Sequence, residues 1–245
     1  MKKKLIGVLG IIFTLGCLYY MSKGLVGITA AYILITFHIT RVIAEILAVR
    51  FIANKSNIRE DIKEEIPRKT GHLLIALVTM PMIYWSFKGT IHLIIFPLLG
   101  LVLTYILNET GLLKELLHRN HKEDDNLAAI VYAIVALLIT GGLSLINPKF
   151  GMPCLLGFAA LGLGDPCACI IGKLFGKHKI YDKKTIEGFI GFIIGATISM
   201  YLFSGVAVWK LIIIAAIGAI AELFSKDYDN LFIPIAVCIT AFFII

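Results

Sequence analysis

Charged residues are scarce in this sequence, because Asp, Glu, Lys and Arg make up only 16% of the 245 residues. Soluble domains carry about 25% charged and about 45–50% apolar residues, whereas 59% of this chain is hydrophobic. The alternation of apolar and polar residues that is typical of barrel strands is also lacking, since the apolar residues form continuous runs. These shortages exclude a soluble domain and favour membrane-spanning helices, which satisfy their own backbone hydrogen bonds in hydrocarbon.

Three other common signatures are missing. Cys167-x-Cys169 has the wrong spacing for a zinc-binding pair and no second pair follows, so we expect reduced thiols. The glycines at 172 and 176 lie too close together for a Walker A loop, and no Ser or Thr follows Lys177. No Pro/Ser-rich linker divides the chain. We therefore expect residues 1–245 to form a single membrane domain, with N-terminal helices within 1–63 and a motif-bearing core at 64–234.

The long apolar runs predict the fold class: all-α, a polytopic helical membrane protein with eight or nine transmembrane helices. A run of about 18 or more apolar residues is long enough to cross the bilayer as a helix. The run at 151–172 is rich in glycine and contains Pro153 and Pro166, so a broken or re-entrant helix is an alternative there. The apolar segments lie at 5–21, 25–49, 71–87, 90–108, 127–146, 151–172, 188–206, 210–225 and 231–245.

The net charge of +7 is explained by membrane topology. On a soluble protein it would suggest binding to nucleic acid, but here most lysines and arginines lie in alternate loops between the apolar segments. Such residues accumulate in cytoplasmic loops. The pattern predicts a cytoplasmic N-terminus and a membrane bilayer, rather than a nucleic acid, as the partner of the chain.

A basic cluster with a histidine precedes the third apolar segment. Arg68 and Lys69 can donate hydrogen bonds to phosphate or carboxylate oxygens, and His72 enters the membrane one helical turn later. An anionic-lipid anchor with an interfacial histidine is the alternative interpretation of this cluster.

An acidic residue lies inside an apolar run, at Gly164-Asp165-Pro166. A carboxylate at such depth costs about 2.5–3.5 kcal/mol on insertion scales, so it usually has a partner and a function. If it faces a polar cavity, it is suited to Mg²⁺, which prefers oxygen ligands together with substrate phosphates. A structural ion pair with a lysine is the alternative.

Two further clusters follow. A loop of glycines and lysines suits a polyphosphate, although a positive cytoplasmic loop explains the lysines equally well. Carboxylates crowded near 222–230 repel one another unless a cation is present, and a solvated loop is the alternative to a metal site. Phosphoryl transfer requires cations that bind the phosphate oxygens and carboxylates that bind a metal ion. The loop residues are Lys177, Lys179, Lys183, Lys184, Thr185, Glu187 and Gly188, and the acidic cluster contains Glu222, Asp227, Asp229 and Asn230.

The order of these motifs resembles the polyprenol kinase family, whose members include dolichol kinase, phytol kinase and a CTP-dependent diacylglycerol kinase. The resemblance runs from residue 64 to 234, and its specificity lies in the combination of motifs rather than in any one of them. The matching motifs are Arg68-Lys69-x-x-His72, Gly164-Asp165-Pro166-x-Ala168, Gly172-x-x-x-Gly176, Lys184-Thr185-x-Glu187-Gly188, and Glu222 with Asp229-Asn230-x-x-x-Pro234.

The resemblance implies a lipid-alcohol kinase whose active site faces the cytoplasm. It would use Mg²⁺ and CTP, or another nucleoside triphosphate such as ATP. Its substrate would be an isoprenoid alcohol such as phytol, dolichol or another polyprenol, or diacylglycerol. For the general base, Asp165 is favoured over His72. The resemblance assigns catalysis to Asp165, His72 and Lys69, nucleotide binding to Arg68, Lys177, Lys179, Lys183, Lys184, Thr185, Glu187 and Gly188, and metal binding to Asp165, Glu222, Asp227, Asp229 and Asn230.

Two other functions remain alternatives. A cytidylyltransferase acting on a lipid phosphate shares the many-helix plan, but the long C-terminal signature of CDP-diglyceride synthases is absent from this sequence. A lipid or ion transporter is expected to place ionisable groups near the middle of the membrane, and only His38, Arg41 and Glu45 suggest this.

Overall fold

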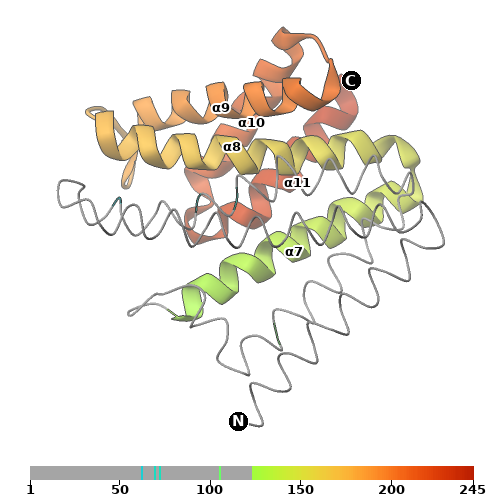
Figure 1. The fold of residues 1–245 in the computed structure, drawn as a ribbon, viewed down its shortest axis with the longest axis horizontal. Coiled ribbons are helices and arrows are strands. Elements are labelled where there is room, and N and C mark those ends of the chain that lie inside the picture. The colour runs from blue at the N-terminus through green and yellow to red at the C-terminus, as the bar shows by residue number, and fades with distance from the viewer. Residues whose placement is uncertain (1–61, 63–68, 70–71, 73–104, 106–122) are drawn as a thin grey trace, which may run out of the picture.

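The computed structural model describes residues 123–245, together with Ile62, Lys69, His72 and Tyr105 of the preceding chain (Figure 1). Helices dominate this part of the protein, and two short 3-10 turns and one small hairpin connect them. The elements are α7 (Glu123–Ile146), η2 (Pro148–Phe150), α8 (Gly151–Phe175), β1 (Lys179–Tyr181), β2 (Lys184–Thr185), α9 (Ile186–Ser204), α10 (Val208–Phe224), η3 (Lys226–Tyr228) and α11 (Asp229–Ile244).

The prediction of a helical membrane protein is confirmed. Each of the last five predicted apolar segments forms a helix, from α7 to α11. Within the described part of the chain, three stretches are long and apolar enough to cross a membrane: Pro148–Phe175, Ile186–Ser204 and Lys226–Ile244. Apart from His72 and Tyr105, the four segments predicted before residue 109 lie outside the described residues, so the total of eight or nine helices and the cytoplasmic N-terminus stay predictions.

Apolar side chains also cover the outer faces of these helices. Ile190, Ile194 and Ile198 of α9 are exposed and recur every four residues, so they form one stripe on the helix. On α10, Ile213 and Ile217 are likewise exposed. Exposed stripes of this kind are suited to the hydrocarbon of a bilayer, since lipid tails are as apolar as the side chains themselves.

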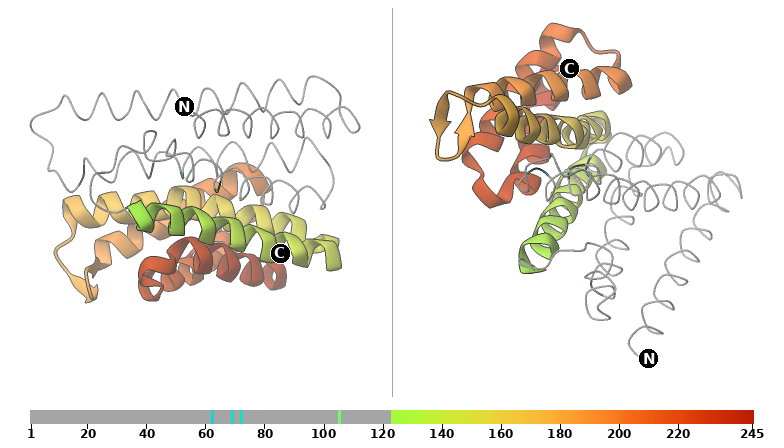
Figure 2. Two further views of the ribbon diagram at one scale, coloured as in Figure 1. Left: turned by 90° about the horizontal axis from the view of Figure 1, so that it is seen from below. Right: turned by 60° about the vertical axis from the view of Figure 1, so that its left-hand side comes forward.

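Helix α8 is the centre of the described bundle (Figures 1 and 2). It packs against α9 and α11, while α10 bridges α9 and α11, and α7 lies against α11. The alternative of a broken or re-entrant segment at 151–172 is wrong, because α8 continues through Pro166. Pro153 lies in the first turn, where its missing N–H has no intrahelical partner to lose. Pro166 does remove one such bond, and its burial between neighbouring helices holds the chain helical there.

Glycines let α9 approach α8 closely, as the spacing Gly191-x-x-x-Gly195 predicts. A Cβ atom built on Gly195 would lie 2.7 Å from the backbone oxygen of Leu163, and one on Gly191 would lie 3.1 Å from that of Cys167. A backbone oxygen cannot move aside as a flexible side chain can. The predicted close packing is therefore confirmed.

Replacing Gly195 with alanine should destabilise the folded protein by about 1–3 kcal/mol, the usual cost of overpacking a tight interface. A thermal unfolding curve of the detergent-solubilised protein measures this effect. Gly142→Ala in α7 is the matched control, because a Cβ there meets nothing within 4 Å. Equal melting temperatures for the two variants would contradict the close contact between α8 and α9.

The loop after α8 forms a β-hairpin that the all-α prediction did not include. Strands β1 and β2 pair antiparallel. Asp182 between them has a φ of 49°, in the left-handed region that aspartate tolerates better than most residues. The hairpin returns the chain to α8, so that α9 starts directly beside the end of that helix.

Candidate active site

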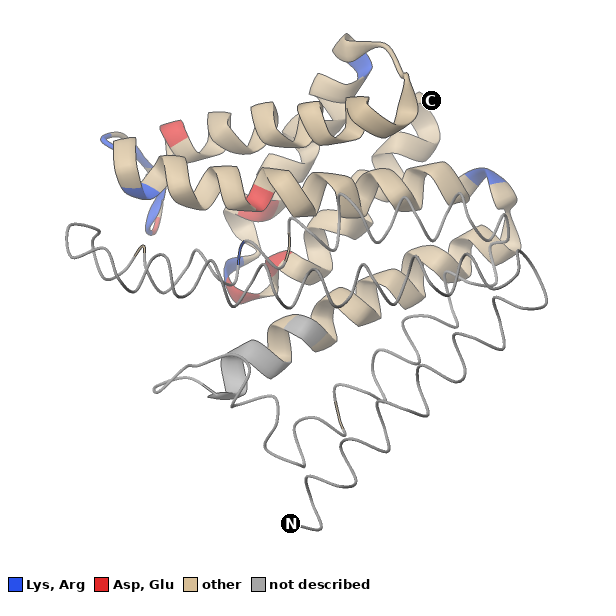
Figure 3. Cartoon of the chain, in the orientation of Figure 1, with Lys and Arg blue, Asp and Glu red and all other residues tan. Residues whose placement is uncertain are grey.

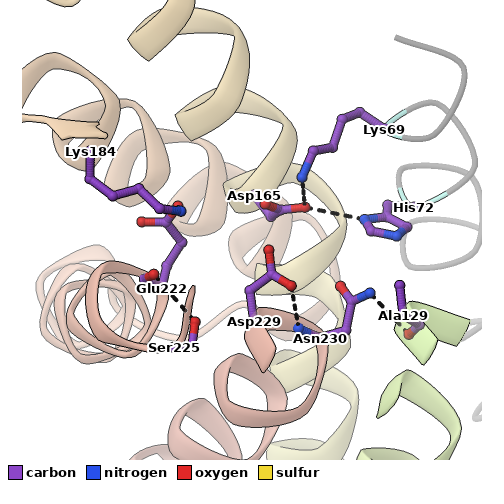
Figure 4. A network of polar contacts seen from close by, with 9 residues as sticks. All are labelled: Lys69, His72, Ala129, Asp165, Lys184, Glu222, Ser225, Asp229 and Asn230. Carbon is purple, nitrogen blue, oxygen red and sulfur yellow. Dashed lines mark hydrogen bonds and ion pairs between the residues drawn. The ribbon is translucent and has the colours of Figure 1, made fainter. Parts of the chain in front are cut away.

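The acidic residues of the described helices lie toward the end of the bundle that carries the hairpin, whereas some lysines lie at the other end (Figure 3). Asp165 lies within α8 and is 2% exposed. Glu222 lies near the end of α10, and the short turn η3 leads from there to Asp229 and Asn230 in the first turn of α11. Lys184 comes from β2 (Figure 4). The tight connection between α10 and α11 thus places their polar ends together against the middle of α8.

Asp165 is held by two residues of the basic cluster. The Nζ atom of Lys69 donates to Oδ2 of Asp165 at 2.5 Å, and Nδ1 of His72 lies 3.2 Å from the same oxygen (Figure 4). Lys69 is only 3% exposed, so it contacts the carboxylate rather than lipid headgroups. The three residues that the resemblance assigns to catalysis, Lys69, His72 and Asp165, therefore lie together, and the lysine ion pair that was the alternative for Asp165 is present. Arg68 lies outside the described residues.

Lys184 forms a second ion pair. Its Nζ atom donates to Oε1 of Glu222, whose side chain is 6% exposed. Burial lowers the pKa of Lys184, but the nearby carboxylates of Glu222, Asp165 and Asp229 raise it by more. The pKa of Lys184 therefore lies above its ordinary value. Lys184 is therefore a stable cation in the field of several carboxylates.

The acidic end of α11 is tied to α7. The backbone N–H of Asn230 donates to Oδ1 of Asp229 at 2.9 Å. The side-chain Nδ2 of Asn230 donates to the backbone oxygen of Ala129 at 3.0 Å (Figure 4). Asn230 is 1% exposed, so this side chain is a fixed part of the wall of the site. By contrast, Asp227 is exposed on η3.

The predicted nucleotide-binding loop divides into two groups. Lys177, Lys179 and Lys183 are exposed on the hairpin, whereas Lys184 reaches the buried cluster. The remaining residues of the loop, Thr185, Glu187 and Gly188, make structural contacts. An excess of positive charge on the cytoplasmic side does not explain why these three residues are present. The Oγ1 atom of Thr185 accepts a hydrogen bond from the Gly188 backbone N–H at 3.1 Å and caps α9. Glu187 Oε1 lies 2.7 Å from His178 Nδ1, and a Cβ on Gly188 would lie 2.9 Å from the Ala168 oxygen.

The motif Gly172-x-x-x-Gly176 lies under this same cap. A Cβ on Gly176 would lie 2.7 Å from Cγ2 of Thr185, and one on Gly172 would lie 3.3 Å from its Oγ1. The two glycines let the hairpin cross closely over the end of α8. Their spacing therefore positions Lys184, which directly precedes Thr185.

The charges of the cluster are suited to a divalent cation bound together with a substrate. Among the described residues, Lys69 and Lys184 lie beside the carboxylates of Asp165, Glu222 and Asp229, so cations and carboxylates are close together. Within the described part of the chain, no group of three or more His, Cys, Asp or Glu side chains could hold a metal ion. The five predicted metal ligands therefore do not form a complete metal-binding site by themselves. Mg²⁺ commonly takes only one or two carboxylates and completes its shell with water and substrate phosphates, and this donor set fits that mode.

Three contacts of the site were missed by sequence reasoning. The backbone oxygen of Ala129 carries no signal in a sequence, because every residue has one. Ser225 follows Glu222 by three residues, and its Oγ donates to the Glu222 backbone oxygen at 3.3 Å. The pair of His178 with Glu187 joins the residue before β1 to the first turn of α9, and this contact depends on the hairpin, which was not predicted.

Comparisons with known proteins add a family and several relatives. The sequence profile of the Cytidylyltransferase family matches residues 3–243. A dolichol kinase of Schizosaccharomyces pombe is 28% identical over 187 residues, which cover 68% of this chain and 37% of that protein. An uncharacterized protein of Methanocaldococcus jannaschii is 32% identical over 180 residues, or 71% of this chain and 90% of that protein.

A shorter match involves a phosphatidate cytidylyltransferase of Staphylococcus saprophyticus. It is 31% identical over 91 residues, which cover 32% of this chain and 35% of that enzyme. The chain therefore spans little more than a third of the length of the dolichol kinase that it matches. No solved structure matches the chain significantly.

Proposed function

Because the chain belongs to the cytidylyltransferase family, we propose that its buried polar cluster transfers a phosphoryl group from a nucleoside triphosphate to a membrane lipid alcohol. The observation that carries this proposal is the environment of Asp165. A buried carboxylate held by Lys69 and His72, beside the pair of Lys184 and Glu222, combines a candidate base with cations for phosphate oxygens. The similarity to a dolichol kinase favours a lipid alcohol as acceptor.

The donor lies on the hairpin side of the cluster in this proposal. Lys184 and the exposed lysines 177, 179 and 183 neutralise the phosphates, with Arg68 adding a further cation, while Thr185, Glu187 and Gly188 shape the loop that presents them. CTP is the favoured donor because of the family to which the chain belongs, and ATP is the alternative. The lysine-rich loop is expected to face the cytoplasm, where nucleotides are available.

The acceptor hydroxyl meets the γ-phosphate next to Asp165. Its oxygen forms a bond to the γ-phosphorus while the bond from that phosphorus to the bridging oxygen of the nucleoside diphosphate breaks. Phosphoryl transfer passes through a loose transition state, so the hydroxyl proton leaves late. Asp165, or His72 beside it, receives that proton. Asp165 and Asp229 would hold Mg²⁺, with Glu222 and Asp227 as further candidates, and the ion would neutralise charge on the phosphates.

Radiolabelled nucleotide distinguishes this reaction from its rivals. Purified protein in detergent, given Mg²⁺ and γ-labelled CTP or ATP, should transfer label to at least one member of a panel of phytol, dolichol and diacylglycerol. Chelation of the metal with EDTA serves as the control and should stop the transfer. A chain that labels no alcohol from either nucleotide is not a lipid-alcohol kinase.

A cytidylyltransferase reaction is the second candidate, favoured by the similarity to a phosphatidate cytidylyltransferase. That reaction would attach the α-phosphate and the nucleoside to a lipid phosphate, and it would release pyrophosphate. Incubation with α-labelled CTP and phosphatidate separates the two reactions, because only the second one labels the lipid from the α position.

A further inference from the structure

The side-chain oxygen of Asn230 lacks a hydrogen-bond donor. Its Oδ1 atom is buried and has no partner among the described residues, although the residue is only 1% exposed. Buried polar atoms in native proteins are nearly always paired, and leaving an acceptor unpaired is unfavourable. An exception within a polar site points to a ligand that supplies the missing donor.

The orientation of this amide is fixed. Nδ2 of Asn230 donates to the backbone oxygen of Ala129 at 3.0 Å, and turning the amide over would place two oxygens against each other. Thr197 Oγ1 is the other buried side-chain atom without a partner in the described part of the chain. A threonine hydroxyl in a helix can rotate toward a carbonyl of the preceding turn, whereas Asn230 has no comparable choice. Of these two atoms of the described chain, Asn230 Oδ1 is therefore the one that needs a donor from elsewhere.

The oxygen points into the candidate active site. In Figure 4 it is directed toward the space bordered by Asp165, His72 and Asp229, and it lies across the cluster from Lys184. Carboxylates accept hydrogen bonds and cannot donate them when ionised, so the neighbouring acids cannot satisfy Oδ1. Phosphates on the Lys184 side cannot do so either. The acceptor substrate, which would enter on the opposite side, carries a hydroxyl donor.

We propose that Asn230 Oδ1 accepts a hydrogen bond from the hydroxyl of the lipid alcohol and thereby binds and orients the acceptor substrate. This inference rests on the proposed function. The hydroxyl keeps its hydrogen until late in a loose phosphoryl transfer, so the bound alcohol needs an acceptor that does not remove the proton. A neutral amide oxygen is such an acceptor. Asn230 accordingly contributes to alcohol binding, while Asp165 contributes to the transfer itself.

Alcohols and their methyl ethers test this contact, because an ether keeps the lipid chain and loses the donor hydrogen. Affinities of phytol and phytyl methyl ether, and of dioctanoylglycerol and its methyl ether, are measured by calorimetry in detergent without nucleotide. The unaltered protein should bind one of the alcohols about tenfold more tightly than its ether, the worth of one hydrogen bond. In Asn230→Leu, which keeps the side-chain volume, alcohol and ether should bind equally.

Kinetics give an independent readout. Asn230→Leu should raise KM for the alcohol about tenfold with kcat nearly unchanged. The lost hydrogen bond is equally strong in the bound substrate and in the transition state, so only binding is weakened. Asn230→Ala serves the same purpose if the leucine variant does not fold. Thr197→Val is the matched control: it removes the other buried atom that lacks a partner in the described part of the chain, on α9, and should alter neither KM nor the preference for alcohol over ether.

An unchanged preference for alcohol over ether in both Asn230 variants would overturn the proposal. If those variants also required more Mg²⁺ for activity, Oδ1 would be assigned to the metal instead. Because the binding comparison needs no nucleotide, a protein that shows the preference but transfers no phosphate keeps this inference and loses only the proposed function.

Discussion

Asp165→Asn is expected to reduce kcat for phosphoryl transfer by about 10²–10⁴-fold, the range of a positioned acid–base group. Asparagine has nearly the same shape, so helix α8 should keep its packing. It cannot hold a negative charge opposite the Lys69 ammonium or take the proton from the alcohol. Transfer of label from γ-labelled nucleotide to the lipid, followed over time in detergent, measures the loss.

Asp182→Asn is the matched control for that substitution. Asp182 is exposed in the turn of the hairpin and has a positive φ that asparagine tolerates equally well. The activity of the Asp182→Asn variant should equal that of the unaltered protein. Retained turnover in Asp165→Asn would remove Asp165 from the reaction.

Stability and activity can be separated at the same site. Asp165→Asn leaves Lys69 buried without its counter-charge, which is costly in a protein interior. We therefore expect a lower melting temperature in detergent as well as lost activity. The added substitution Lys69→Met removes the stranded charge and should recover the melting temperature without recovering transfer. A double variant that regains activity would show that the single variant was merely poorly folded.

Lys184→Met is expected to raise KM for the nucleotide by roughly 10–100-fold, the equivalent of one charge-assisted hydrogen bond to phosphate. The same change leaves Glu222 unpaired near Asp165 and Asp229. Because a third of the Lys184 side chain is exposed to solvent, the loss of stability should be limited to about 1–3 kcal/mol. Initial rates at varied CTP or ATP and thermal unfolding measure the two effects.

Two further variants define the origin of these effects. Lys149→Met is the matched control, since Lys149 is exposed on η2, which precedes α8, whereas the hairpin follows the other end of that helix. It should change neither nucleotide affinity nor stability. Adding Glu222→Gln to Lys184→Met removes the unpaired charge, so stability should return while nucleotide affinity stays low. If affinity returned with stability, Lys184 would act only through the fold.

Hydrophobic patterning was sufficient to predict the helices because the length of an apolar run is a local property of the chain. The segments at 127–146 and 188–206 match α7 and α9 to within a few residues. The cost of a lone carboxylate in an apolar run likewise singled out Asp165 without any structure. Proline misled the prediction at 151–172, because the neighbours that bury α8 are not visible in its own sequence.

Pairings between distant segments were decided only by the tertiary structure. The sequence by itself determined that the chain forms membrane helices and that Asp165, Glu222 and Asp229 are chemically unusual there. The packing of α7, α8, α10 and α11 decides which lysine contacts which carboxylate. It also decides that the side-chain oxygen of Asn230 points into the site. Those contacts join residues far apart in the chain, and no local rule of hydrophobicity or charge specifies a helix–helix contact geometry of this kind.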